Sequence, residues 1–171
     1  MKKIELICVG KIKENYLKEA IAEYLKRLTR YCELSVLELK EEGDNPSVVV
    51  AKESSAILEK IGMRTNDSKG YTLGRPPESN KNITSILLDR TGELITSEQL
   101  AAYIDNFFTN GSTKIQFIIG GSHGVDNIVK QSASKIISFG KITYPHQLMR
   151  VITLEQIYRS MCILGKVPYH K

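Results

Sequence analysis

Apolar residues along the chain occur in two alternating patterns. Short continuous apolar runs at 4–9, 34–39, 83–88, 115–119 and 135–139 have the length and composition of buried strands. Between most of these runs, apolar residues recur every three or four positions, which is the spacing of an amphipathic helix. Strands that are apolar on both faces and alternate with helices predict an α/β fold with a mostly parallel sheet flanked by helices.

Capping residues mark several helix boundaries in this pattern. Asn45 and Pro46 suit the N-cap and the first turn of a helix that runs to about 61. Thr96 and Gln99 have the spacing of a capping box at the start of a later helix. The last helix is expected over about 145–165. These boundaries fit the strand positions and support the same fold class.

The segment 62–82 interrupts the alternation. Its sequence, GMRTNDSKGYTLGRPPESNKN, is polar and rich in Gly, Pro, Asn and Ser, which is typical of a loop. We therefore expect an exposed, mobile loop insertion there. A chain of 171 residues supplies one full hydrophobic core and hardly two. The sequence thus predicts one domain over 1–171.

Charge and cysteine content narrow the function classes. The 24 Lys and Arg residues against 19 Asp and Glu residues give a formal net charge of +5, which is compatible with an anionic partner without requiring one. Cys8, Cys32 and Cys162 are scattered, without Cys-x-x-Cys spacing, which argues against a zinc ribbon or a disulfide framework. There is no membrane-length apolar stretch and no signal-peptide pattern. We expect a cytoplasmic protein with no metal site and no membrane contact.

The stretch IGGSHG at 119–124 follows a predicted strand and turns through Gly120 and Gly121. In parallel sheets, ligands bind beyond the carboxyl ends of the strands, so this turn should meet the residues after Leu88 and the segment 139–144. The turn matches neither G-x-G-x-x-G nor G-x-x-x-x-G-K-[ST], so a dinucleotide or a nucleoside triphosphate is not indicated. A tight packing turn and a ligand cradle both fit the glycines taken alone.

The C-terminal part of the chain carries further candidate chemistry. Glu155 and Arg159 are one helical turn apart, with the acid N-terminal to the base as an ion pair prefers. A plain surface ion pair and a functional arginine oriented by its partner both fit this spacing. Glu155 shares its helix face with apolar residues, which places the pair beside buried surface and favours the functional interpretation. Tyr169 and His170 lie in a short tail that composition alone would leave disordered.

Several motifs in one order resemble a known family. They are the glycine turn, the F-x-K-x-T-[FY]-P-H-Q-x-x-R pattern at 139–150, the E-Q-x-Y-R pattern at 155–159, the terminal P-Y-H-K, and the opening VGKIKENYLKEAIAEYLKRL. Together they closely resemble the RlmH (YbeA-like) family of SPOUT-class methyltransferases, over nearly the whole chain. The segment 62–82 is longer than this family leads us to expect.

The resemblance implies a SPOUT fold with a C-terminal deep trefoil knot, which periodicity would not reveal because knotted chains are rare exceptions. It also implies S-adenosyl-L-methionine as the cofactor, bound in the knot, with the glycine turn packed against it. The implied cofactor-binding residues are Leu88, Gly120, Phe139, Gly140, Lys141, Ile142, Thr143 and Tyr144.

The activity implied by the resemblance is methylation of N3 of a pseudouridine in 23S ribosomal RNA, with the assembled ribosome as partner. The implied catalytic residues are Glu155, Arg159, Tyr169 and His170. An imide nitrogen must lose its proton as it takes the methyl group, so cations that stabilise the anion and a proton acceptor are the expected groups. We expect a homodimer in which the tail acts beside the cofactor of the other subunit. A SPOUT enzyme for transfer RNA and a catalytically silent ribosome-binding module of the same fold are the alternatives.

Overall fold

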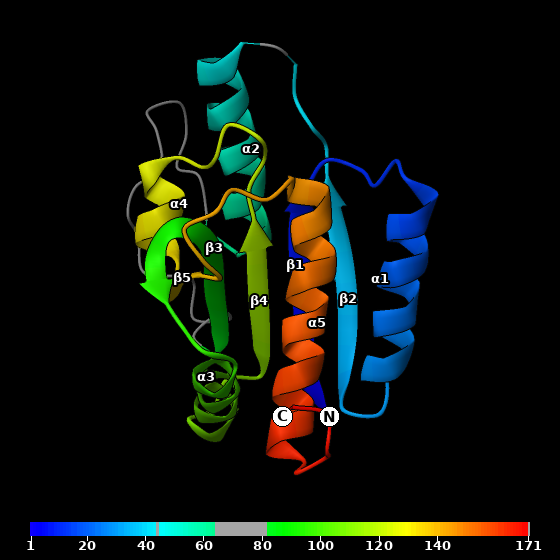
Figure 1. Ribbon diagram of the computed structural model, residues 1–171. Coiled ribbons are helices and arrows are strands. Elements are labelled where there is room, and N and C mark those ends of the chain that lie inside the picture. The colour runs from blue at the N-terminus through cyan, green and yellow to red at the C-terminus, as the bar shows by residue number, and fades with distance from the viewer. Residues whose placement is uncertain (44, 64–81, 171) are drawn as a thin grey trace.

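The computed structural model describes residues 1–43, 45–63 and 82–170. Its centre is a five-stranded sheet in the order β2-β1-β4-β3-β5, in which every neighbouring pair is parallel (Figure 1). The strands are β1 (Lys2–Val9), β2 (Cys32–Leu39), β3 (Ile83–Leu94), β4 (Lys114–Ile119) and β5 (Lys135–Ser138). The helices are α1 (Asn15–Leu28), α2 (Pro46–Lys60), α3 (Ser97–Thr109), α4 (Asn127–Ser132) and α5 (His146–Leu164). The α/β fold with a parallel sheet is confirmed.

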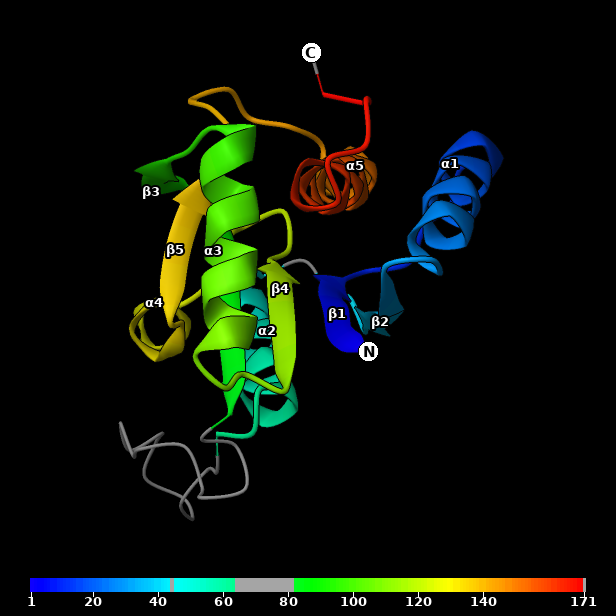
Figure 2. The same cartoon turned by 90° about the horizontal axis from the view of Figure 1, so that it is seen from below.

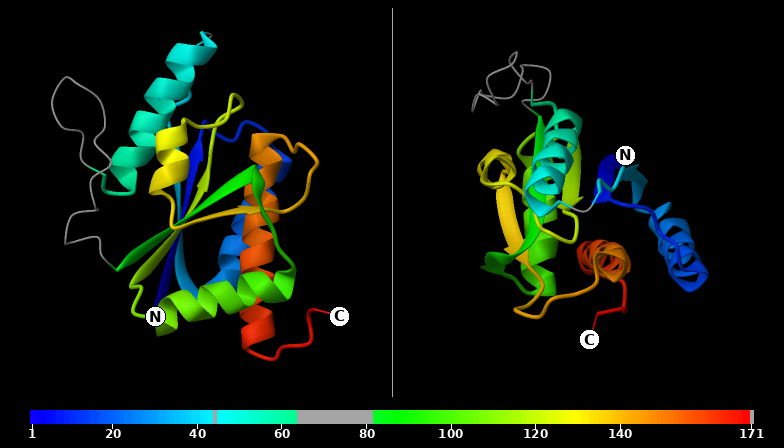
Figure 3. Two further views of the ribbon diagram at one scale, coloured as in Figure 1. Left: turned by 90° about the vertical axis from the view of Figure 1, so that its left-hand side faces the viewer. Right: turned by 90° about the horizontal axis from the view of Figure 1, so that it is seen from above.

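Helices cover both faces of the sheet, and β1 shows how its sequence serves both. Ile4, Leu6 and Cys8 point into a core shared with α1, α3 and α5, whereas Ile7 and Val9 point into a second core shared with α2 and α4. Successive side chains of a strand point to opposite faces, so a strand buried on both sides must be apolar throughout. Figure 3 shows α2 and α4 on one side of the sheet and the other helices opposite.

Helix α5 lies between α1 and α3 on the same face of the sheet (Figure 2). Its Arg150 is fully buried and donates hydrogen bonds to the carbonyl oxygens of Val9, at 2.8 Å, and Gly10, at 2.9 Å. The same guanidinium forms an ion pair with Glu38 at 2.7 Å. A buried cation is tolerated only when acceptors surround it, so these three contacts fix the start of α5 at the carboxyl ends of β1 and β2.

Strand β3 is longer than the run 83–88 that the apolar pattern predicts. After Leu88 its register against β5 shifts, and Glu93 and Leu94 resume the pairing. A Cβ atom at Gly92 would lie 2.7 Å from the backbone of Ile137, so only glycine allows the two strands to approach this closely. The polar residues between 89 and 93 conceal this extension from a reading based on apolar runs.

The predicted capping residues differ in what their side chains do. Thr96 accepts a hydrogen bond from the backbone N–H of Gln99 at 3.2 Å, and the Gln99 side chain accepts one from the backbone N–H of Thr96 at 2.8 Å. The capping box is therefore confirmed. Asn45 occupies the N-cap of α2, but its side chain makes no capping hydrogen bond and instead accepts one from Ser47 at 3.1 Å.

The remaining predictions about the fold have mixed outcomes. Cys8, Cys32 and Cys162 are free and buried, as core thiols should be. Within the described ranges, no helix is long and apolar enough to cross a membrane. The predicted insertion at 62–82 lies outside the described residues except for its ends, and the trefoil knot stays a prediction.

Candidate active site

A cavity of about 860 Å³ opens beyond the carboxyl ends of β4 and β5, beside the part of β3 where its register shifts after Leu88. Its walls come from 88–91, 119–125 and 137–146, except Lys141, together with Lys130 of α4 and Met149 of α5. The sequence pattern places the same three segments together at one edge of the sheet, although 89–91 belong to β3 and not to a loop after it. The parallel arrangement brings them together although they are far apart along the chain.

Seven of the eight residues expected to bind a cofactor line this cavity. Lys141 is the exception, because it is exposed and does not contribute to the lining. Ile142 lies at the rim with 70% of its surface exposed. The residues of the set that do line the cavity are Leu88, Gly120, Phe139, Gly140, Ile142, Thr143 and Tyr144.

The three glycines of the turn are needed for three different reasons. A Cβ atom at Gly120 would lie 2.6 Å from the side chain of Val125. One at Gly121 would collide with the carboxylate of Glu53. Gly124 has open space around it but a φ of +80°, which favours glycine on backbone grounds. The turn is tightly packed from behind, which confirms the packing interpretation, and it also lines the cavity, while its role as a ligand cradle stays a prediction.

Asp89 and Lys130 form a polar contact in the wall of the cavity that sequence reasoning missed. Oδ1 of Asp89 accepts hydrogen bonds from the backbone N–H and the hydroxyl of Thr91, at 2.8 and 2.6 Å, and Oδ2 lies 2.8 Å from Nζ of Lys130. Burial raises the pKa of Asp89, but the hydrogen bonds from Lys130 and Thr91 outweigh it and leave the pKa below its usual value. Among the described residues, Asp89 is the only carboxylate that lines the cavity. It can accept hydrogen bonds from sugar hydroxyls.

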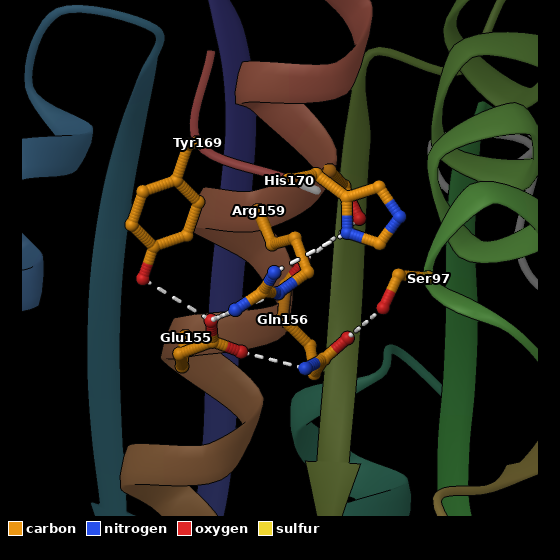
Figure 4. Close-up of polar contacts among 7 residues, drawn as sticks. Ser97, Glu155, Gln156, Arg159, Tyr169 and His170 are labelled. Atoms are coloured by element: carbon orange, nitrogen blue, oxygen red, sulfur yellow. Dashed lines mark hydrogen bonds and ion pairs between the residues drawn. The ribbon is translucent and has the colours of Figure 1, made fainter. Parts of the chain in front are cut away.

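The four expected catalytic residues meet in one hydrogen-bonded cluster (Figure 4). Oε1 of Glu155 accepts hydrogen bonds from Nε and Nη2 of Arg159, at 3.0 and 2.5 Å, and from the hydroxyl of Tyr169 at 3.3 Å. Nη1 of Arg159 lies 3.2 Å from Nδ1 of His170. The functional interpretation of the Glu155–Arg159 spacing thus gains two partners from the tail.

Aromatic contacts order this tail, which composition alone would leave disordered. The ring of Tyr169 packs edge-on against Tyr158, with centroids 4.9 Å apart. The same ring contacts Arg159, whose guanidinium carbon lies 4.9 Å from the ring centroid of Tyr169. Tyr158 in turn contacts Tyr24 of α1 and Tyr31. The tail is therefore anchored by side-chain packing.

Residues of α3 and α5 support the cluster from its other side. Gln156 donates a hydrogen bond to Glu155 at 2.6 Å and accepts one from Ser97 at 2.9 Å. Nε2 of His170 lies 2.7 Å from Oε1 of Glu98. Because an arginine can only donate hydrogen bonds, Nδ1 of His170 is the acceptor in the contact with Arg159, which leaves Nε2–H to donate to Glu98. Ser97 and Glu98 were not predicted as partners, since only the packing of α3 on α5 brings them close to the cluster.

The surroundings shift the pKa values of Tyr169, Arg159 and the neighbouring Glu98. Burial, with the neighbouring Tyr24 and Glu155, raises the pKa of Tyr169 to about 12, so its phenol is a neutral hydrogen-bond donor at pH 7. The hydrogen bond to Glu155 raises the pKa of Arg159 above its usual value. Hydrogen bonds from Thr96, its own backbone N–H and His170 lower the pKa of Glu98 to about 2. A fixed cation beside a neutral donor can stabilise an anion that develops in a reaction.

Comparisons with known proteins match the chain over almost its full length. Residues 1–170 match the family model described as a predicted SPOUT methyltransferase. A protein named ribosomal RNA large subunit methyltransferase H from Clostridium beijerinckii is 45% identical over 168 residues, covering 98% of this chain and 99% of the relative. Proteins of the same name from Fusobacterium nucleatum and Bifidobacterium adolescentis are 42% and 43% identical over 170 and 169 residues, covering 98% and 99% of this chain and 99% of each relative.

The chain belongs to the RlmH family of SPOUT methyltransferases. In this family member, no group of three or more His, Cys, Asp and Glu side chains within the described residues is placed to hold a metal ion. The family assignment agrees with the motifs read from the sequence.

The cavity and the catalytic cluster of this SPOUT chain lie at different levels of α5. Met149 lines the cavity near the start of the helix, whereas Arg159 belongs to the cluster near its end. At 1.5 Å of rise per residue, these positions are about 15 Å apart along the helix axis. Figure 1 shows the tail at the opposite end of α5 from the carboxyl ends of β1, β2 and β4. One chain therefore assembles each set of expected residues but does not bring the two sets together.

Proposed function

We propose that this protein transfers the methyl group of S-adenosyl-L-methionine to N3 of a pseudouridine in 23S ribosomal RNA, in the cytoplasm and on the assembled ribosome. It does so as one SPOUT domain over 1–171. The names of its relatives and the motifs of the RlmH family support the RNA substrate. The observation that carries the proposal is the cavity, in which residues of three separate family segments meet.

The lining of the cavity suits S-adenosylmethionine. Its volume lies in the range of small-molecule sites, and Leu88, Ile119 and Met149 offer apolar surface to an adenine ring. Asp89 offers an ionised acceptor to the ribose hydroxyls, already oriented by Thr91 and Lys130. The cofactor supplies a methyl group on a sulfonium, which needs no metal for direct displacement.

The cluster around Arg159 suits the methyl acceptor. N3 of the pseudouridine gives its proton to solvent water and takes the methyl group as the anion, so a nearby fixed cation stabilises the reactive anion more than the neutral base. Glu155 holds the Arg159 guanidinium through two hydrogen bonds and so removes the freedom it would otherwise lose on substrate binding. Tyr169, as a neutral phenol, donates a hydrogen bond without adding charge.

The distance between cavity and cluster leads us to propose a homodimer with composite active sites. In this arrangement the cavity of one subunit faces the tail of the other, so that cofactor and catalytic residues meet across the interface. A symmetric dimer would contain two such sites, because each subunit supplies one cavity and one tail.

The direct test of the proposed function is methylation of ribosomes from a strain that lacks the gene. We expect purified protein with S-adenosylmethionine to add one methyl group to a pseudouridine, identified by mass spectrometry of the nucleosides. Free 23S RNA and transfer RNA are the comparison substrates. Methylation of transfer RNA in preference to ribosomes would establish the alternative substrate, and no methylation with cofactor bound would favour a silent ribosome-binding module.

A further inference from the structure

Glu53 of α2 is a buried carboxylate that the proposed mechanism does not use. Only 2% of the surface of Glu53 is exposed. Oε1 accepts a hydrogen bond from the backbone N–H of Glu42 at 3.2 Å, whereas Oε2 is buried and has no hydrogen-bond partner in the described part of the chain. Burying a carboxyl group with an unsatisfied oxygen is unfavourable, so its retention at this position calls for a reason.

The carboxyl group of Glu53 lies directly behind Gly121 of the cavity wall. A Cβ atom at Gly121 would collide with Oε2, and would lie 3.1 Å from Cδ of Glu53 and 3.3 Å from Cγ1 of Val9. The φ angle of Gly121 is not in the left-handed region. The backbone conformation therefore does not demand glycine at 121, whereas a Cβ atom there would require the Glu53 carboxyl group or the turn to move.

The residue after Glu53 holds the other end of the same turn. Oγ of Ser54 accepts a hydrogen bond from the backbone N–H of Asp126 at 2.9 Å, and Asp126 caps α4. Helix α2 lies on the sheet face behind the turn, near the carboxyl end of β4 (Figure 1). Two consecutive side chains of α2 thus contact both ends of the segment 121–126, which lines the cavity between them.

We infer that Glu53 is a positioning residue of the cofactor site, whose buried carboxyl group sets the place of the Gly121 backbone and so the shape of the cavity wall. This inference rests on the proposed function. On this inference, residue 121 is a glycine because a side chain there would collide with Glu53. The alternative is that it is a glycine because the ligand itself must approach closely. The two cases make opposite predictions for a double-mutant cycle.

The test combines Gly121→Ala with Glu53→Ala and measures the dissociation constant of S-adenosylmethionine by calorimetry. In the parent background, we expect Gly121→Ala to weaken binding about tenfold or more, because the methyl group pushes the turn away from Glu53. In the Glu53→Ala background, the same change should alter the dissociation constant by about twofold or less, since the collision is gone. An equal loss in both backgrounds would overturn the inference, because the glycine would then serve the ligand.

Two further variants make the cycle specific. Glu53→Gln keeps the shape of the side chain, so Gly121→Ala should remain harmful with it. Gly120→Ala disturbs the same turn through Val125, so its effect should be the same with and without Glu53. Coupling of Glu53 to Gly120 as strong as to Gly121 would contradict a local contact. Melting temperatures of all variants show whether each is folded at the temperature of the measurement.

Kinetics distinguish positioning from general support of the fold. We expect Glu53→Ala to raise KM for the cofactor while kcat at saturating cofactor stays close to that of the parent, and Glu53→Gln to restore most of the affinity. A fall in kcat with unchanged KM would overturn the assignment. If the parent protein itself binds no S-adenosylmethionine, the proposed function fails, whereas binding by the parent without coupling in the cycle rejects only the role of Glu53.

Discussion

The cavity and the catalytic cluster are built in different ways. The cavity is made by backbone turns and a mixture of apolar and polar side chains near the ends of parallel strands, with Asp89 as its oriented carboxylate. The cluster is made by charged and aromatic side chains of α5 and the tail, which hold one another through hydrogen bonds and ring contacts. The first region suits binding of a ligand and the second suits stabilisation of charge. Their separation within one chain explains why we propose that two copies form each active site.

Blocking the cavity should have the largest effect. Gly120→Val adds bulk where a Cβ atom would already lie 2.6 Å from Val125, so the turn must move. We expect cofactor affinity to fall about a hundredfold or more, as when a packed site is overfilled. Calorimetry on the folded variant measures this, and Gly43→Val is the matched control because nothing lies within 4 Å of a Cβ atom there. Unchanged affinity of Gly120→Val would remove the glycine turn from the site.

Removing the cation of the cluster should affect catalysis and spare cofactor binding. For Arg159→Ala we expect methyl transfer to hypomethylated ribosomes to fall about a hundredfold, the usual effect of losing a group that stabilises charge in the transition state. The control is Lys3→Ala, since Lys3 forms an exposed ion pair with Glu33 away from the cluster. Loss of cofactor affinity in proportion to the rate would instead place Arg159 in the cofactor site.

Weakening the orientation of Arg159 should have a smaller effect than deleting it. Glu155→Gln removes the charge that holds the guanidinium but keeps one acceptor oxygen, so we expect the rate of methyl transfer to fall about tenfold. Single-turnover kinetics on the same ribosome preparations measure it. A loss larger than that of Arg159→Ala would indicate that Glu155 acts on the substrate directly.

Glu53, buried behind the cavity, and Glu98, exposed beside the cluster, should contribute to stability with opposite dependence on pH. Burial raises the pKa of Glu53, with Glu41 and Glu42 adding to the rise, while the Glu42 N–H and His123 oppose it. A folded-state pKa above the unfolded one gives stability that is present at low pH and lost as pH rises through the folded pKa. As pH rises through the folded-state pKa of Glu53, the free energy of unfolding of the Glu53→Gln variant should therefore increase relative to that of the parent. Urea unfolding at a series of pH values measures it.

Glu98 supplies the contrast for this measurement. Its pKa is lowered to about 2, so its contribution is present above the unfolded pKa and is lost as pH falls towards 2. The Glu98→Gln variant should therefore have a lower free energy of unfolding than the parent at neutral pH, and this difference should disappear in acid. The same trend with pH for both variants would show that burial does not raise the pKa of Glu53.

The two regions also differ in how far the sequence predicts them. The strand ends that form the cavity follow from apolar runs and the geometry of parallel sheets, and the pair Glu155 and Arg159 follows from helical spacing. The extension of β3 past Leu88 does not follow, because pairing with β5 stabilises a polar stretch there. Asp89 could have been suspected from its place after a buried strand. Its partner Lys130 could not, since only the approach of α4 to β3 brings it near.

Glu53 marks the limit of sequence reasoning most clearly. It stands in a helix between Lys52 and Ser54, where an acid is usually solvated, and no local pattern indicates that it is buried. The reason for Gly121 is equally non-local, since the colliding group comes from another element of the fold. The pattern of residues along the sequence does not predict contacts between side chains of distant segments. Such contacts support both the cavity and the catalytic cluster.

Mixing two inactive variants tests the composite site most directly. Gly120→Val damages only the cavity and Arg159→Ala only the cluster, so a mixed dimer contains one site with both halves intact. With random pairing, half of the dimers are mixed and each has one working site, so we expect about a quarter of the parent methyl-transfer activity. Light scattering on each preparation must first give a particle of twice the chain mass of 19.2 kDa. Recovery to that level would support two copies per active site, and activity no higher than the sum of the separate variants would contradict it.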